Sequence, residues 1–364
     1  MAPLLVLTLL CGAYQAVVYL YIFRGALAAD GDHAAARGGV APVSLIVCYR
    51  NEARKLGSCV PALLAQDHPD FELLLVDDHS TDGSADLAAA LTAGDPRVRR
   101  LRPPGPTRPG KKDALGYGIA AARHERLLLT DADCQPAGPD WLRRMTAPLA
   151  AADYELVLGA APYAGGASFL HRWQRFEATY TALQYLGYAR RGRPYMGVGR
   201  NLAYCRSLYR RAGGFAAHAD RAGGDDDLLV NAAARPRTTA RVTDPAAWTY
   251  SAPSDSWAAY LRRKFRHHSV GAAYDRGTQL RLGLLALTHG LFYLSLLGLF
   301  LAGYWGAALA GLLPRWALVL ATYGPARVRE FARIPVAFPL IGDALLGPYY
   351  LVTACGAIFA TRRW

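Results

Sequence analysis

The sequence predicts an α/β domain built on a mostly parallel sheet and flanked by transmembrane helices. In the middle of the chain, short β-branched apolar runs alternate with helical segments, a pattern typical of βαβ units. Uncharged apolar stretches occupy both ends of the chain. Carboxylate-rich turns follow several of the predicted strands, and ligands of such sheets bind beyond the carboxyl ends of the strands.

The composition limits the class of protein. The 364 residues are 52% hydrophobic and 19% charged, which excludes an intrinsically disordered chain. The formal net charge is +13, so we expect anionic partners such as phosphates or an anionic membrane surface. No recognised nucleic-acid-binding motif accompanies this charge, and we expect no nucleic-acid partner. The six cysteines lack metal-binding spacing and are expected to be reduced and structural.

The N-terminal apolar run covers residues 4–23 and is long enough to cross a bilayer as a helix. A cleaved signal peptide is the alternative, because residues 26–28 would suit a cleavage site. The run is longer than the apolar part of a typical signal peptide, and no basic residue precedes it. We therefore expect residues 1–27 to be a retained anchor and residues 28–42 to be a linker.

The C-terminal region, residues 280–364, contains two or three further apolar segments. The second of them is interrupted at Pro314, and the prolines of residues 335–360 argue against one straight helix there. Basic residues at 326–333 and 362–363 are expected on the cytoplasmic side. This placement predicts a last segment that is re-entrant or interfacial.

The domain between these ends is expected to span residues 43–275. Its first half shows alternating strands and helices, with strands predicted at 43–48, 71–76, 98–101 and 126–129, and helices at 56–66, 84–91 and 112–123. Asp131 and Asp133 follow the last of these strands. Two such carboxylates suit Mg²⁺ or Mn²⁺ shared with substrate phosphates, although alone the pair could also be turn residues that cap a helix.

Six sequence blocks together resemble the family 2 glycosyltransferases, which have the GT-A fold. Four of them match in order and spacing, at residues 43–52, 75–83, 110–115 and 129–133. Residues 223–229 resemble the acidic motif that carries the catalytic base, and residues 263–267 resemble the QxxRW motif. Two departures are Arg263 in the Gln position and His267 in the Trp position.

The resemblance implies a role for each matching residue on the donor side. Asp78 matches the carboxylate that binds the uracil of a UDP-sugar, Asp131 the residue near the ribose, and Asp133 the ligand of Mg²⁺ or Mn²⁺. Asp131 is a further candidate for the metal. The remaining candidates for nucleotide-sugar binding are Glu52, Lys111, Lys112 and Arg266.

The resemblance also implies the catalytic and acceptor residues. Asp226 is the expected base and Asp225 its competitor, because residues 225–227 are consecutive carboxylates and leave the frame open. A single base that assists direct displacement gives inversion at the anomeric carbon. The expected acceptor-binding residues are Asn201, Arg263 and His267.

The resulting hypothesis is a membrane-bound inverting glycosyltransferase. It would move a sugar from a nucleotide-sugar, UDP-linked, to a lipid or other membrane-proximal acceptor. The catalytic domain would lie in the cytoplasm at the inner membrane, where nucleotide-sugars are made. The alternatives are a processive polysaccharide synthase, which His267 and the few C-terminal helices disfavour, and a non-catalytic scaffold, which the retained carboxylates disfavour. The aromatic helical segment 169–188 is expected to be a buried or membrane-lying face.

Overall fold

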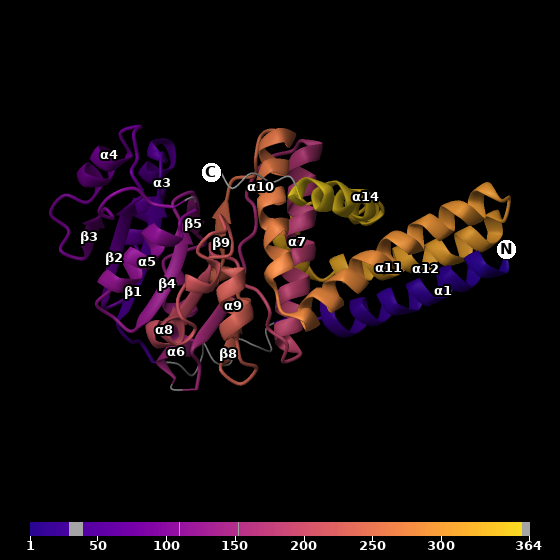
Figure 1. Cartoon of the computed structure of the whole chain (residues 1–364), viewed down its shortest axis with the longest axis horizontal. Helices are drawn as coiled ribbons and strands as arrows, with labels where there is room; N and C mark the ends of the chain where they lie inside the picture. The colour runs from indigo at the N-terminus through magenta and orange to yellow at the C-terminus, as the bar shows by residue number, and fades with distance from the viewer. Residues whose placement is uncertain (29–38, 109, 152, 359–364) are drawn as a thin grey trace. The chain divides into compact units, whose positions relative to one another are not determined.

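The computed structural model describes residues 1–28, 39–108, 110–151 and 153–358, and Figure 1 labels its elements. The chain forms two compact units. The α/β unit comprises Ala28–Ala164 and Tyr188–Ala252, and the helical unit comprises Met1–Leu27, Gly165–Gly187 and Pro253–Ala360. Residues 165–187 and 253–275, expected within the domain 43–275, therefore group with the helical unit. Most of the expected linker 28–42 and the end of the expected region 280–364 lie outside the described residues.

The sheet of the α/β unit confirms the predicted fold class. Its parallel part consists of β1 (Val43–Tyr49), β2 (Phe71–Asp77), β3 (Val98–Leu101) and β4 (Arg126–Asp131). It continues through β7 (Leu202–Cys205), β6 (Leu156–Gly159) and β8 (Thr239–Val242). Within the described ranges the order is β3-β2-β1-β4-β7-β6-β8, and β7 runs antiparallel to both of its neighbours. A small separate sheet pairs β5 (Cys134–Pro136) with β9 (Thr249–Ser251).

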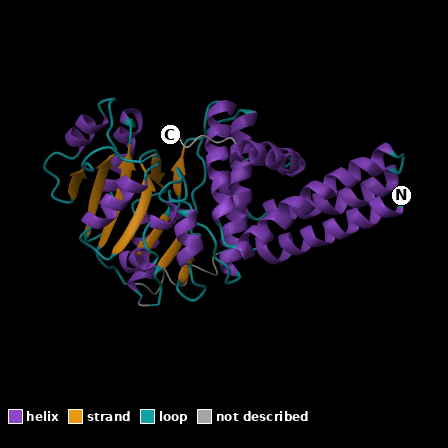
Figure 2. Ribbon diagram, in the orientation of Figure 1, coloured by secondary structure: helices purple, strands orange, loops and turns teal. Residues whose placement is uncertain are grey.

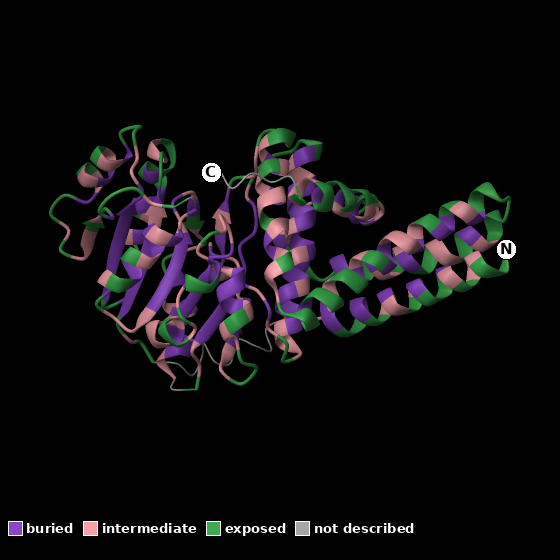
Figure 3. Ribbon diagram, viewed as in Figure 1, coloured by how far each residue is buried: buried purple, intermediate pink, exposed green. Residues whose placement is uncertain are grey.

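The helices of this unit pack around the sheet (Figure 2). They are α3 (Ala53–Leu64), α4 (Ser84–Leu91), α5 (Lys112–Ala121), α6 (Trp141–Ala150), α8 (Arg206–Arg211) and α9 (Asp227–Ala233), with the short 3₁₀ turns η3 (Ala216–His218) and η4 (Pro245–Ala247). Every residue of β2 is buried, as expected for a parallel strand covered on both faces (Figure 3). Helix α5 approaches the sheet closely, since a Cβ at Gly118 would lie 2.9 Å from Cγ2 of Val76.

The helical unit holds the apolar ends of the chain. Its elements are α1 (Ala2–Val17), the π-helix η1 (Val18–Phe23), α7 (Phe169–Arg190), α10 (Trp257–Val270), η5 (Gly271–Ala273), α11 (Arg276–Leu301), α12 (Trp305–Tyr323), α13 (Ala326–Ala332) and α14 (Phe338–Ile358). In the described part of the chain, four helices are long and apolar enough to cross a membrane. These are Ala2–Phe23, Arg276–Leu301, Trp305–Tyr323 and Phe338–Ile358.

The last apolar segment forms one continuous helix, α14, against the expectation drawn from its prolines. Pro339 lies in the first turn, where a missing N–H leaves no helical hydrogen bond unmade. Pro348 lies inside the helix, as Pro314 does in α12. Apolar helices tolerate such a proline when neighbouring helices and local adjustments satisfy the freed carbonyl group.

The aromatic segment on α7 is buried, which confirms its predicted role as a packed face. Trp173, Phe176, Tyr180 and Tyr185 are each no more than 2% exposed. The ring of Phe176 stacks on that of Tyr323 from α12, with the ring centres 5.4 Å apart. These residues belong to the core of the helical unit.

A buried ion pair joins the candidate spans. The guanidinium of Arg315 on α12 contacts both carboxylate oxygens of Asp343 on α14, at 2.6 and 2.9 Å. The hydroxyl groups of Tyr19 on η1 and Tyr293 on α11 donate to the same carboxylate, at 2.9 and 2.6 Å. The side chain of Arg315 is 3% exposed and that of Asp343 is not exposed at all. All four candidate spans therefore meet at one polar cluster.

We predict that breaking this pair destabilises the helical unit. The variant Asp343→Leu leaves the Arg315 guanidinium buried without its carboxylate and should lose about 3–5 kcal/mol of stability. The double variant Arg315→Met/Asp343→Leu, which buries no unpaired charge, should lose clearly less. The measurement is thermal unfolding in detergent, and a single variant as stable as the wild type would contradict the expectation.

Candidate active site

The carboxyl ends of the central parallel strands bring polar side chains to one edge of the sheet. In the strand register, Tyr49 at the end of β1 pairs with Asp77 at the end of β2, and Cys48 pairs with Asp131 at the end of β4. The loops that follow these strands therefore start at the same level. This edge is where ligands bind in open α/β sheets.

Two of these loops are tied to each other by hydrogen bonds. The amide oxygen of Asn51 accepts from the backbone N–H of Thr81 at 2.8 Å, and the Ser80 hydroxyl accepts from the N–H of Asn51 at 3.0 Å. The Ser84 hydroxyl accepts from the N–H of Glu52 at 2.8 Å. Asn51 adopts a left-handed backbone conformation, with φ 57°, which asparagine tolerates better than most residues. The turn residues thus fix the loop after β1 against the loop after β2.

Asp78 lies between these loops with one oxygen unsatisfied. The residue is 2% exposed, and its Oδ1 accepts from the Thr107 hydroxyl at 2.6 Å. Its Oδ2 is buried and accepts no hydrogen bond from the described residues, although the Arg50 guanidinium lies 3.8 Å away. A buried carboxylate oxygen without a donor is costly. The geometry therefore suits a ligand that supplies an N–H or O–H group.

Lys111 joins carboxylates from two distant segments. Its Nζ lies 2.7 Å from Oδ1 of Asp131 and 3.1 Å from Oδ2 of Asp225. Burial of the amine opposes its charged form, but the carboxylates of Asp131, Asp225 and Asp226 outweigh this effect and raise the pKa of Lys111 well above its ordinary value. The residue stays a cation and compensates the carboxylates around it.

Asp226 is held by the backbone. Its Oδ2 accepts from the N–H of Gly199 at 2.7 Å, and its Oδ1 accepts from the N–H of Asp227 at 2.8 Å. Burial and then the neighbouring charge of Asp225 raise the pKa of Asp226, against the opposing effect of Lys111. The carboxylate is therefore both fixed in position and more basic than an ordinary aspartate.

Lys112 anchors the segment that precedes these carboxylates. Its Nζ donates to the backbone carbonyl groups of His218, Arg221 and Gly223, at 2.7, 2.9 and 2.5 Å. Gly110 packs against the same segment with φ 101°, and a Cβ there would lie 2.5 Å from the Ala222 carbonyl oxygen. The two lysines expected near the nucleotide thus differ: Lys111 joins the carboxylate cluster and Lys112 binds backbone.

The second acidic group of the site contains Asp133. Its Oδ2 lies 3.6 Å from the Nζ of Lys55, which in turn lies 3.0 Å from Oε2 of Glu52. Burial raises the pKa of Glu52, with Lys55 opposing the shift. Over the described ranges, no three His, Cys, Asp or Glu side chains converge as a complete metal site. Mg²⁺, however, often binds one or two carboxylates together with phosphates and waters, so the pair Asp131 and Asp133 fits a cation brought with a diphosphate.

Two cations near these carboxylates were not identified from the sequence. Arg200 lies in the glycine-rich stretch before β7, and its Nη2 donates to the Ala161 carbonyl at 3.1 Å. Burial opposes its charge, but Tyr163, Cys134 and the carboxylates at 131 and 133 raise its pKa above the ordinary value. The second cation is Lys55 on α3. Its position three residues after Glu52 is the only sequence signal for this pair.

The expected acceptor residues belong to different units: Asn201 to the α/β unit, and Arg263 and His267 to the helical unit. The Asn201 side chain is fully buried, accepts from the indole N–H of Trp141 at 3.0 Å, and donates to the carbonyl groups of Ala160 and Ala247 at 2.8 Å. The amide group of Asn201 therefore makes its hydrogen bonds within the α/β unit. Arg263, Arg266 and His267 lie on α10, in the helical unit. Burial and the neighbouring cations hold the pKa of His267 well below its ordinary value.

Part of the chain is similar in sequence to known proteins. Residues 44–213 match the sequence profile of glycosyl transferase family 2. An uncharacterised glycosyltransferase of Nostoc sp. is 36% identical over 91 residues, which are 25% of this chain and 28% of that protein. The glycosyltransferase AglE of Haloferax volcanii is 28% identical over 138 residues, 37% of this chain and 44% of that protein. The chain thus spans less than half the length of these relatives.

A solved structure supports the same assignment at the level of the fold. The mannosyltransferase PcManGT of Pyrobaculum calidifontis, in complex with GDP-Man and Mn²⁺, superposes with a TM-score of 0.55 and 22% identity, over 93% of this chain and 99% of that one. The α/β unit therefore has the GT-A fold. Residues 44–213 match glycosyl transferase family 2, the family that the sequence blocks resemble.

We predict that Lys111→Met destabilises the site in a pH-dependent way. Without the ammonium, Asp131, Asp225 and Asp226 repel one another, so stability at pH 8 should fall by about 3 kcal/mol. Protonation of the carboxylates relieves this repulsion, and the loss at pH 5 should be smaller. Thermal unfolding at both pH values measures the effect.

Lys112→Met is the matched control for this experiment. Its amine binds carbonyl groups, which acid does not neutralise, so its loss of stability should be similar at both pH values. Equal losses for Lys111→Met at pH 5 and pH 8 would show that the carboxylates do not depend on its charge.

Proposed function

We propose that the chain is a membrane-bound inverting glycosyltransferase that uses a UDP-sugar and a divalent cation and glycosylates a lipid or membrane-proximal hydroxyl. The observation that carries the proposal is the unsatisfied Oδ2 of Asp78 at the same sheet edge as the carboxylates of Asp131 and Asp133. A pyrimidine base presents the N–H group that this oxygen lacks. The catalytic domain, residues 43–275, would work on the cytoplasmic side of the inner membrane.

The residues divide the work between donor and acceptor. Asp78 would bind the base of the nucleotide, and Asp131 and Asp133 would hold Mg²⁺ or Mn²⁺ against the diphosphate. When bound, the cation would stabilise the negative charge that develops on the leaving group. Lys111, already positioned by Asp131, would add its own positive charge near the donor.

Asp226 would act as the base. The acceptor oxygen attacks the anomeric carbon, its proton passes to the Asp226 carboxylate, and the bond between that carbon and the diphosphate oxygen breaks. A base works best when its pKa lies near the working pH, and burial raises the pKa of Asp226. The ion pair between Asp225 and Lys111 favours Asp226 over Asp225 in this role.

The donor site is tested by thermal stabilisation of the detergent-purified chain with UDP, GDP, ADP and CMP, each with and without Mn²⁺. We predict a Mn²⁺-dependent shift with UDP. The variant Asp78→Asn should weaken UDP binding about tenfold or more, because a charged acceptor is lost. Asp133→Asn should remove the Mn²⁺ dependence.

The control for these variants is Asp86→Asn, an exposed aspartate in the first turn of α4, which should bind UDP as the wild type does. A thermal shift with GDP in place of UDP would indicate a GDP-linked donor and would leave the proposed carboxylate site unchanged. A well-folded chain that responds to none of the nucleotides would support the scaffold alternative.

The base is tested by single substitutions at the acidic block. Asp226→Asn should bind UDP normally and lose turnover about 10²–10⁴-fold. In the wild type, the acidic limb of the rate profile should lie above the ordinary aspartate pKa of about 4, because burial raises the pKa of Asp226. Steady-state kinetics with radiolabelled UDP-sugars and a membrane extract as acceptor measures both effects.

Asp227→Asn is the matched control, since an asparagine can still accept from the N–H of Leu228. Loss of turnover in Asp225→Asn but not in Asp226→Asn would assign the base to Asp225 instead. A ladder of long products in the same assay would favour the processive synthase.

A further inference from the structure

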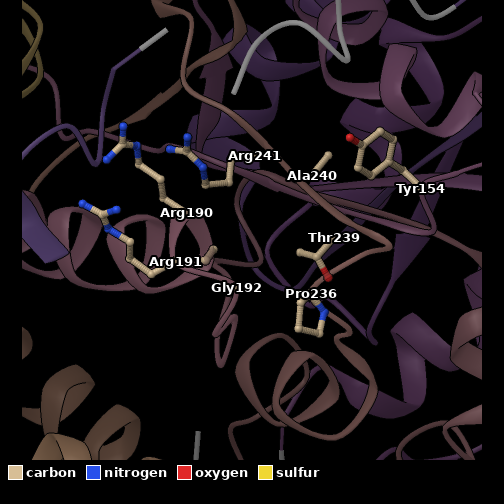
Figure 4. A pocket seen from close by; sticks show the side chains of 9 residues that line it. Tyr154, Arg190, Arg191, Gly192, Pro236, Thr239, Ala240 and Arg241 are labelled. Carbon is tan, nitrogen blue, oxygen red and sulfur yellow. The ribbon is translucent and has the colours of Figure 1, made fainter. Parts of the chain in front are cut away.

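A second polar site lies away from the carboxylate edge. It is a pocket of about 410 Å³ between β8 and the C-terminal end of α7 with the residues that follow it. Its walls include Tyr154, Arg190, Arg191, Thr239 and Arg241, all of which belong to the α/β unit. Figure 4 shows the guanidinium groups of the three arginines on one side of the pocket and Thr239 and Tyr154 on the other.

The chemistry of this pocket suits an anion. No acidic side chain lines it among the residues that the structure describes. The hydroxyl oxygen of Thr239 is buried and has no hydrogen-bond partner in the same part of the chain. Guanidinium groups bind phosphate oxygens in a two-point geometry, and a hydroxyl can add a further donor. The group that best matches these donors is a phosphate.

The sequence around the pocket extends the positive charge. Arg193 follows the lining residue Gly192, and Arg235 precedes the lining residue Pro236. Arg237 follows Pro236 in the same turn. All three are exposed. A buried arginine, Arg241 at 7% exposed, thus sits within a wider basic surface, an arrangement that attracts anionic lipid.

The chain also connects this pocket to a candidate span. Arg241 lies two residues before Thr243, whose hydroxyl donates to the carbonyl of Ala28 at 3.0 Å. Ala28 follows Phe23, the last residue of the first candidate span, by five residues, which reach at most about 18 Å. A short stretch of chain therefore links the segment bonded to this strand with a candidate span.

We propose that this pocket binds the phosphate of an anionic lipid headgroup at the membrane surface. The proposal rests on the membrane attachment proposed above, and it does not depend on glycosyl transfer. The site would hold the α/β unit against the bilayer and so keep the catalytic edge near a membrane-proximal acceptor. It is separate in residues from the donor site, since the two share no side chain.

The test measures binding to the full chain in neutral detergent by isothermal titration calorimetry. The probes are short-chain phosphatidylglycerol, short-chain phosphatidylcholine and inorganic phosphate. We expect phosphatidylglycerol to bind best. The double variant Arg190→Gln/Arg191→Gln, which changes half-buried side chains, should weaken it about tenfold or more. Arg241→Gln should act in the same direction, and the double variant keeps the test valid if this buried substitution fails to fold.

The matched control is Arg100→Gln/Arg210→Gln, which removes the same charge from exposed positions outside the pocket. Equal weakening in both double variants would overturn the proposal, because it would show a general effect of net charge. Inorganic phosphate that binds as tightly as the lipid would overturn the lipid source. UDP binding on the same samples should be unchanged in both double variants, which separates failure of this site from failure of the donor site.

Discussion

The ammonium group of Lys111 is the interaction on which the site depends. It lies within 3.1 Å of carboxylates from the end of β4 and from the segment before α9, which are far apart in the sequence. Without a cation, these carboxylates would repel one another in a partly buried setting. Lys112 reinforces the same junction by binding three backbone carbonyls of residues 218–223. One short stretch at the start of α5 therefore joins the donor side of the site to the base side.

The proposed chemistry follows from this junction. In the proposed function, Asp78, which has an unsatisfied oxygen, would bind the nucleotide base, and Asp131 and Asp133 would hold a cation and a diphosphate. Beyond Lys111, backbone N–H groups fix the Asp226 carboxylate, and burial raises its pKa. A negative leaving group and a proton acceptor need opposite electrostatic surroundings. In the proposed function, Lys111 lies between these two environments, because its Nζ contacts Asp131 on one side and Asp225, next to Asp226, on the other.

Sequence patterns predicted the features that local chemistry determines. The periodicity of the strands and the turn residues after them gave β1, β2 and β4 and placed Asp78 and Asp131 at one edge. Roles that depend on distant partners could not be predicted. The proposed preference for Asp226 over Asp225 rests on the ion pair between Asp225 and Lys111, and the role of Lys112 rests on carbonyls more than a hundred residues away. Pro348 likewise lies inside α14, which its helix-breaking tendency did not predict.

The most direct test of the account is an experimental structure of the full chain with UDP and Mn²⁺. The account predicts a base N–H at hydrogen-bonding distance from Oδ2 of Asp78, with the diphosphate and the metal ion beside Asp131 and Asp133. It also predicts that the carboxylate of Asp226 keeps its backbone donors and faces the sugar side of the donor. A nucleotide bound elsewhere, or a metal ion that contacts neither Asp131 nor Asp133, would contradict it.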